Sequence, residues 1–107
     1  MTGTGLPGPA VEKICGIFHD YPRIQRVILY GSRAMGTHRP GSDIDLCIEA
    51  ESLGLTELLS IENRMDDLLL PWKLDLSLLH QIDNPALLEH IRRVGVIFCP
   101  SQDRERR

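Results

Sequence analysis

The segment that most restricts the fold of this chain is Asp43–Glu49, in which isoleucine or leucine occupies every second position. Successive side chains of a β-strand point to opposite faces of the sheet, so this pattern predicts a strand that buries one face in a core. The other face carries carboxylates at positions that should be half-buried. Its members are Asp43, Asp45, Cys47 and Glu49.

Three further short apolar segments predict strands, namely Arg26–Tyr30, Leu74–Leu79 and Val96–Cys99. Between them, apolar residues recur with helical spacing. The predicted helices run from Pro9 to the break at Asp20-Tyr21-Pro22, from the N-cap Ser32 to Met35, over Thr56–Leu70, and from the N-cap Asn84 to Val94. This order predicts an α/β (α+β) domain with a small mixed β-sheet of about four strands and helices packed on it.

The third of these helices is leucine-rich and is expected to present an apolar stripe to the core. Pro71 ends it. The run Leu68–Leu70 is assigned to the core, with a partner-binding surface as the alternative. The expected core stripe comprises Leu55, Leu58, Leu59, Met65, Leu68 and Leu69.

A chain of 107 residues has room for one domain. Residues 1–8 are rich in Gly, Pro and Thr and are expected to form a flexible leader. The domain then spans residues 9–100, and residues 101–107 are expected to form a disordered tail.

The charged residues and the cysteines indicate which partners and which compartment to expect. Lys and Arg number 12 against 15 Asp and Glu, for a net charge of −3. Apart from the tail Arg104-Glu105-Arg106-Arg107, which is expected to be solvated, the basic residues are scattered and form no clustered basic face that would bind nucleic acid directly. The sequence has no membrane-spanning run and no signal peptide, so we expect a soluble cytoplasmic protein. Cys15, Cys47 and Cys99 are widely spaced and odd in number, which predicts buried, reduced thiols.

The candidate chemistry begins with Asp43 and Asp45, which lie two residues apart on one strand face. A half-buried pair of like charges is unfavourable unless something neutralises it, and Mg²⁺ prefers carboxylate oxygens. Asp75, on another strand, is a candidate third ligand. Three carboxylates suit a site with two metal ions for phosphoryl or nucleotidyl transfer. The alternative is that these aspartates face solvent or simply begin a strand.

Gly31-Ser32 follows the strand at Arg26–Tyr30 and supplies the other half of this candidate site. Glycine allows a phosphate to approach the backbone, and Ser32 offers a hydroxyl and an amide at the start of a helix, where anions are favoured. Arg33 and Arg39 flank the turn, and for each a phosphate contact is as plausible as a solvated surface position.

Together, Tyr30-Gly31-Ser32-Arg33-Ala34, Gly36 and Ser42-Asp43-Ile44-Asp45-Leu46 resemble the signature of the DNA polymerase beta-type nucleotidyltransferase superfamily. The segments 70–76 and 91–97 make the chain similar to its minimal nucleotidyltransferase (MNT) branch. The resemblance implies the nucleotidyltransferase (polymerase beta-like) fold, with two Mg²⁺ ions on Asp43 and Asp45, Asp75 as the third catalytic carboxylate, and the triphosphate of ATP on Gly31 and Ser32. Met35 departs from the basic or polar residue of many relatives.

The resemblance also implies a partner. MNT proteins are typically antitoxins that transfer AMP from ATP to a tyrosine of a helical HEPN toxin, a ribonuclease, and the pair is expected to form a hetero-oligomer. Transfer to a small molecule such as an aminoglycoside is one alternative, although relatives that do this carry an added substrate domain. A second alternative is an antitoxin that neutralises its partner by binding alone.

Three further residues near the motifs are expected to have structural or solvent-exposed positions. Lys73 is a solvated neighbour of Asp75 in the plainer interpretation, and His38 is expected to be exposed in its loop. Trp72 is expected to cover the core after Pro71, with adenine stacking as the alternative.

Overall fold

The structure is a computed structural model that describes residues 5–99. The predicted tail at 101–107 and residues 1–4 of the predicted leader lie outside the described residues. The elements are α1 (Gly8–His19), β1 (Arg26–Tyr30), α2 (Ser32–Met35), β2 (Ile44–Glu49), α3 (Leu55–Asp66), β3 (Leu74–Leu78), a 3-10 turn η1 (Leu79–Gln81), α4 (Pro85–Val94) and β4 (Val96–Cys99).

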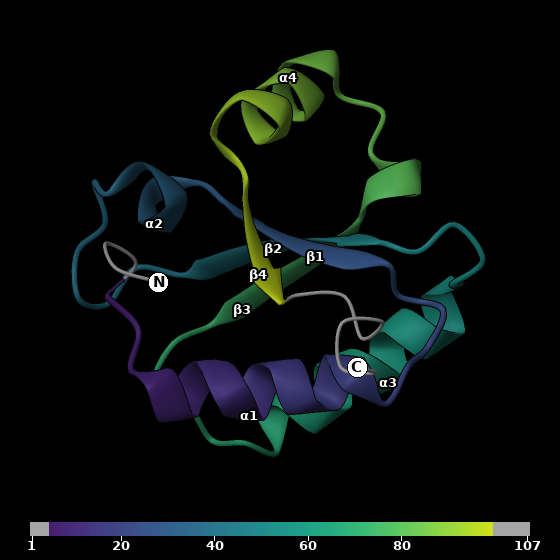
Figure 1. Cartoon of the computed structure of the whole chain (residues 1–107), viewed down its shortest axis with the longest axis horizontal. Helices are drawn as coiled ribbons and strands as arrows, with labels where there is room; N and C mark the ends of the chain where they lie inside the picture. The colour runs from purple at the N-terminus through teal and green to yellow at the C-terminus, as the bar shows by residue number, and fades with distance from the viewer. Residues whose placement is uncertain (1–4, 100–107) are drawn as a thin grey trace, which may run out of the picture.

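The four strands form one mixed sheet in the order β3-β2-β1-β4. Strand β1 pairs antiparallel with both β2 and β4, whereas β2 and β3 run parallel. The parallel pair is joined through α3, as a parallel connection requires a crossover. Helices α1 and α3 lie on one face of the sheet and α4 lies on the other (Figure 1). The predicted fold class is therefore confirmed.

The alternating strand at β2 positions the main core as predicted. Its isoleucine and leucine side chains are fully buried on the face that α1 and α3 cover. Strands β1 and β3 have the same two-residue period, so their alternate side chains also point to opposite faces of the sheet. The buried strand residues on this face are Val27, Leu29, Ile44, Leu46, Ile48, Leu76, Leu78 and Phe98.

The opposite face carries a smaller apolar cluster beneath α4, centred on Tyr30, Cys47 and Ile91. The N-cap of α4 is Asn84, as predicted, and its side chain accepts the amides of Ala86 and Leu87 at 2.9 and 3.3 Å. Because this face is apolar only under α4, it has room at its edge for the polar side chains of β2 and β3.

Helix α3 differs from the prediction in length and in its buried stripe. It ends at Asp66, four residues before the predicted end at Leu70, and Leu69 adopts φ 56. Because Leu69 is in the left-handed conformation, its side chain points away from the core and is 87% exposed. Leu55 and Leu59 are also exposed. The stripe runs instead through Leu58, Ile61, Met65 and Leu68.

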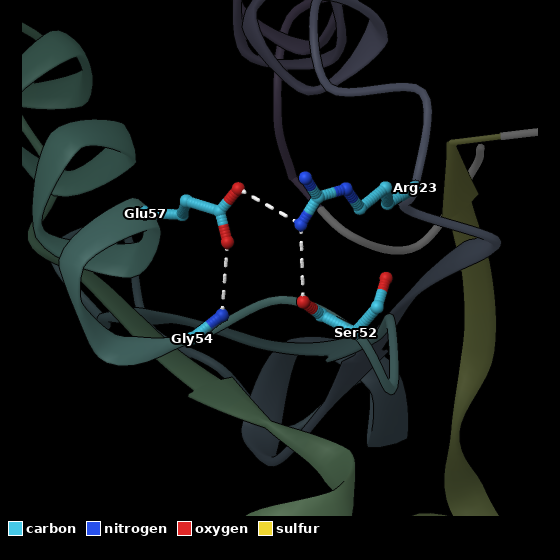
Figure 2. A network of polar contacts seen from close by, with 4 residues as sticks. All are labelled: Arg23, Ser52, Gly54 and Glu57. Atoms are coloured by element: carbon cyan, nitrogen blue, oxygen red, sulfur yellow. Dashed lines mark hydrogen bonds and ion pairs between the residues drawn. The ribbon is translucent and has the colours of Figure 1, made fainter.

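The start of α3 is tied to the turn before β1 by a small polar network (Figure 2). The Glu57 side chain accepts the amide of Gly54 at 3.0 Å, which satisfies one of the free amides at the helix start. Its second oxygen pairs with Arg23 at 3.2 Å, and the same guanidinium nitrogen donates to the carbonyl of Ser52 at 3.2 Å. This network helps to fix the loop after β2.

The prediction of three reduced cysteines is wrong for one pair. Cys15 of α1 and Cys99 at the end of β4 form a disulfide, with a Cα–Cα distance of 5.7 Å. Their separation of 84 residues gave no sign of this contact, which arises because α1 packs beside β4. Cys47 is a free, buried thiol as predicted, and burial raises its pKa to about 11.

Among the described residues, no helix has both the length and the apolar composition needed to cross a membrane.

Candidate active site

Two of the three predicted carboxylates are neighbours across the parallel strand pair. Asp45 of β2 and Asp75 of β3 are direct partners in the register, and both lie on the face of the sheet that α4 partly covers. Asp45 is half-buried as expected, whereas Asp75 is exposed, so the expectation that it is half-buried is wrong. Asp43 comes one residue before β2 and is exposed, so it belongs to the loop that leads into the strand. The predicted strand began at Asp43, and the observed strand begins at Ile44.

The electrostatic environment of Asp45 is that of a crowded carboxylate. Burial is the main cause that raises the pKa of Asp45, and repulsion from Asp75 and Asp43 adds to it. His90 acts in the opposite direction. Asp75 and Asp43 therefore both act on the carboxylate of Asp45 electrostatically.

Gly31 brings the predicted phosphate-binding turn against this carboxylate. It adopts φ 78 and ψ −157, a conformation that is essentially restricted to glycine. A Cβ atom at this position would lie 2.3 Å from Oδ2 of Asp45. Asp45 is also the register partner of Tyr30, the residue before the glycine. The absence of a side chain at Gly31 is thus what allows the turn and the carboxylate to meet.

Ser32 is the first residue of α2, and the residue at the N-cap is Gly31. The prediction that Ser32 caps this helix is therefore wrong by one position, because the glycine already occupies the non-helical conformation of a cap. The carbonyl of Ser32 accepts the amide of Thr37 at 3.0 Å, which closes the short helix.

Arg33 is buried, with 2% of its surface exposed. Its guanidinium donates to the carbonyl of Ser42 at 3.0 and 3.2 Å and to the carbonyl of Pro40 at 3.1 Å. It also lies 5.8 Å from the ring centroid of Trp72. The structure thus places the side chain of Arg33 on the loop before Asp43, and neither predicted environment, phosphate or open solvent, describes these contacts.

His90 is a site residue that was not predicted from the sequence. It extends from α4, and its Nε2 accepts the amide of Gly31 at 3.2 Å. Its ring meets the ring of Tyr30 edge-on, with centroids 6.1 Å apart. The available signal was its position three residues after Leu87, on the same side of the helix as the apolar stripe.

A comparison with protein families identifies the chain. The family model described as Polymerase beta, Nucleotidyltransferase matches residues 12–104. The chain belongs to this nucleotidyltransferase family. The match spans the Gly31-Ser32 turn and all three aspartates, and it confirms the resemblance found in the sequence.

Solved structures share the fold of this nucleotidyltransferase. A toxin–antitoxin with AMP-PNP matches at a TM-score of 0.69 and 24% identity, over 88% of this chain and 76% of that chain. A tri-AMPylated Shewanella oneidensis HEPN toxin in complex with MNT antitoxin matches at 0.65 and 20% identity, over 91% and 75%. The toxin–antitoxin MntA-HepT matches at 0.65 and 20% identity, over 92% and 77%. No curated protein matches the chain in sequence.

The three aspartates of this nucleotidyltransferase offer the donor atoms that a hard cation prefers, although their side chains are not clustered. Asp43, Asp45 and Asp75 offer only carboxylate oxygens, which Mg²⁺ prefers. Within residues 5–99, no three His, Cys, Asp or Glu side chains are arranged closely enough to hold a metal ion. Burial, and after it repulsion from Asp75 and Asp43, raises the pKa of Asp45, and a divalent cation would relieve the repulsion.

The other candidates lie at the margin of the site. Arg39 is exposed, and its amide donates to the hydroxyl of Ser42 at 2.8 Å. Lys73 is exposed, as expected, and its carbonyl accepts the amide of Ile44 at 2.9 Å. His38 is half-buried, so the expectation that it is exposed is wrong.

Proposed function

We propose that this nucleotidyltransferase is an antitoxin that transfers AMP from ATP to a hydroxyl, that of a tyrosine, on a cognate HEPN-type toxin. The observation that carries the proposal is the meeting of the Gly31 turn with Asp45, whose register partner is Asp75. A turn that can accept phosphates lies beside carboxylates that can accept cations. The related folds seen with AMP-PNP and with a tri-AMPylated HEPN toxin support the nucleotide and the partner.

Each half of the site has a separate role in this proposal. Asp43, Asp45 and Asp75 would hold two Mg²⁺ ions, which when bound lower the pKa of the acceptor hydroxyl and neutralise charge on the leaving group. Gly31 and Ser32 would receive the triphosphate on their backbone and hydroxyl groups. The acceptor hydroxyl releases its proton to solvent as its oxygen forms a bond to the α-phosphorus, the bond from that phosphorus to the bridging oxygen breaks, and pyrophosphate leaves.

The face of the sheet next to α4 is the side from which an acceptor would approach, because Asp45 and Asp75 lie on that face. We place the protein in the cytoplasm, in a hetero-oligomer with the toxin, with no direct nucleic-acid or membrane contact. The net charge of −3 supports a protein acceptor over a nucleic acid.

The test is to incubate the protein with ATP, Mg²⁺ and the HEPN-type protein encoded beside it, and to measure the intact mass of that partner. We expect the partner to gain AMP with the wild type and not with Asp43→Asn or Asp45→Asn. Asp66→Asn is the matched control, because this exposed carboxylate lies on α3, on the opposite face of the sheet.

Three results would contradict the proposal. A partner that gains no nucleotide excludes it as the acceptor, and labelling of an aminoglycoside under the same conditions would favour a small-molecule acceptor. Asp→Asn variants that still protect cells from the toxin would indicate neutralisation by binding alone.

A further inference from the structure

The strongest unexplained arrangement lies beside the carboxylates. The guanidinium of Arg33 directs Nε and Nη2 at the carbonyl oxygen of Ser42, and Nη2 also reaches the carbonyl of Pro40. The indole N–H of Trp72 donates to the same Pro40 carbonyl at 3.1 Å. The cation and the indole also face each other at 5.8 Å. Two side chains from separate segments thus hold one short loop.

These contacts join the three segments that carry the proposed site. Arg33 directly follows the Gly31-Ser32 turn, the loop directly precedes Asp43, and Trp72 comes three residues before Asp75. The carbonyl of Ser42 belongs to the peptide bond that leads into Asp43. Asp43 lies outside the ladder of β2, so its position depends on the two peptides that flank it. The peptide after it is held by the bond from the Ile44 amide to the Lys73 carbonyl, and the peptide before it is held by the two bonds from Arg33.

We propose that Arg33 and Trp72 form a clamp whose role is to position Asp43 for metal binding. The two are positioning residues, and the inference rests on the proposed function in that it assigns a cation to Asp43. Burial of Arg33 suits this role, because a guanidinium enclosed by carbonyl oxygens holds a fixed geometry that a solvated one does not.

The clamp and a phosphate contact by Arg33 make different predictions. A phosphate contact would mainly raise the KM for ATP when Arg33 is changed, and Trp72 would be irrelevant to it. A clamp makes the two residues act together. It predicts that changes in either one lower kcat and weaken metal binding, while the KM for ATP stays within about twofold, because the phosphate-binding turn is untouched.

The informative variant is Trp72→Phe, which keeps an aromatic ring beside the guanidinium and removes the N–H that binds Pro40, together with part of the ring system that packs against the core. We expect it to lower kcat, and the affinity for Mg²⁺ in the presence of AMP-PNP, by about 10–100-fold, the usual effect of losing a group that orients a metal ligand. Arg33→Lys keeps the charge, loses the forked geometry and should act in the same direction.

The chain offers a matched control. Tyr21 lies 5.7 Å from the guanidinium of Arg64 and bonds Ser60 through its hydroxyl at 3.1 Å, so Tyr21→Phe also keeps a ring beside an arginine and removes one polar contact. We expect it to leave kcat and Mg²⁺ binding unchanged. Thermal unfolding of each variant checks that it is folded.

Mg²⁺ binding by calorimetry separates failure of the clamp from failure of the proposed function. If Trp72→Phe and Arg33→Lys bind Mg²⁺ and transfer AMP as the wild type does, or if Arg33→Lys changes only the KM for ATP, the clamp is refuted. If the wild type fails to label the toxin but Mg²⁺ binding weakens in Trp72→Phe, the clamp stands and the proposed acceptor is wrong.

Discussion

Replacement of Gly31 by alanine tests the central contact of the site. Gly31 has φ 78 and ψ −157, and an alanine Cβ would lie 2.3 Å from Oδ2 of Asp45. Forcing a side chain into this backbone region costs about 1–3 kcal/mol. For a domain of this size, each kcal/mol lowers the Tm by about 4–8 °C. We therefore expect Gly31→Ala to fold with a lower Tm.

The larger effect should be on catalysis. The carboxylate of Asp45 or the turn itself must move to admit the methyl group, because a Cβ atom at Gly31 would be closer to an oxygen than real contacts allow. A displacement of about 1 Å in a reacting group can reduce the rate by about 100-fold. We expect AMP transfer by Gly31→Ala to fall by at least that order.

Gly36→Ala separates backbone strain from the clash with Asp45. Gly36 has the same φ of 78, and among the described residues no atom lies within 4 Å of a Cβ built there. This variant should lose about 1–2 kcal/mol of unfolding free energy and keep its transfer rate. Urea unfolding gives the stabilities, and the rate of toxin labelling gives the activities. Equal transfer rates for the two variants would refute the assignment of Gly31 to the site.

Three further predictions concern stability. Asp45→Asn should have a higher free energy of unfolding than the wild type, because the raised pKa of Asp45 means that its charged form is unfavourable in the folded chain. The difference in unfolding free energy, measured with urea, should grow as the pH rises above the ordinary Asp pKa of 3.8. A difference that does not depend on pH would contradict this. Asn84→Ala should cost about 0.5–2 kcal/mol by removing the cap of α4, against little change in the exposed control Asn63→Ala. Leu69→Gly should raise the unfolding free energy by about 1 kcal/mol, because glycine adopts a positive φ without strain and the leucine side chain that is lost is 87% exposed. A lower unfolding free energy would show that the backbone at Leu69 is not strained.

The placement of Asp45 and Asp75 on one face of the sheet could be predicted because it follows local rules. The two-residue period of β2 assigns Asp45 to one face, and the same period in β3 assigns Asp75. Any parallel pairing of these strands that buries both apolar faces brings the two carboxylates to the same side of the sheet. Glycine at the end of β1 signalled a close approach, and the structure shows that the approaching group is Asp45.

The rest depends on contacts between distant segments, for which no local pattern exists. The disulfide joins Cys15 to Cys99 across 84 residues, and periodicity alone could not distinguish it from two buried thiols. His90 reaches Gly31 from the last helix, and its sequence context shows only that it lies near the apolar side of α4. The end of α3 was misplaced because leucine runs continue past Asp66, whereas the backbone turns left-handed at Leu69.

Arg33 shows why the surroundings of a residue inside a motif are hard to predict from the sequence. A cation next to a phosphate-binding turn suggests a phosphate ligand, because charge is the property that a sequence displays. The sequence does not show that the side chain of Arg33 is buried. In the folded chain its guanidinium is enclosed by Trp72 and by the carbonyls of the loop. The contacts of Arg33 also explain how the ten residues between Ser32 and Asp43 are held in place. They carry the chain away from the turn and back to the sheet, and a loop of that length needs a fixed point if the carboxylate at its end is to be held in one place.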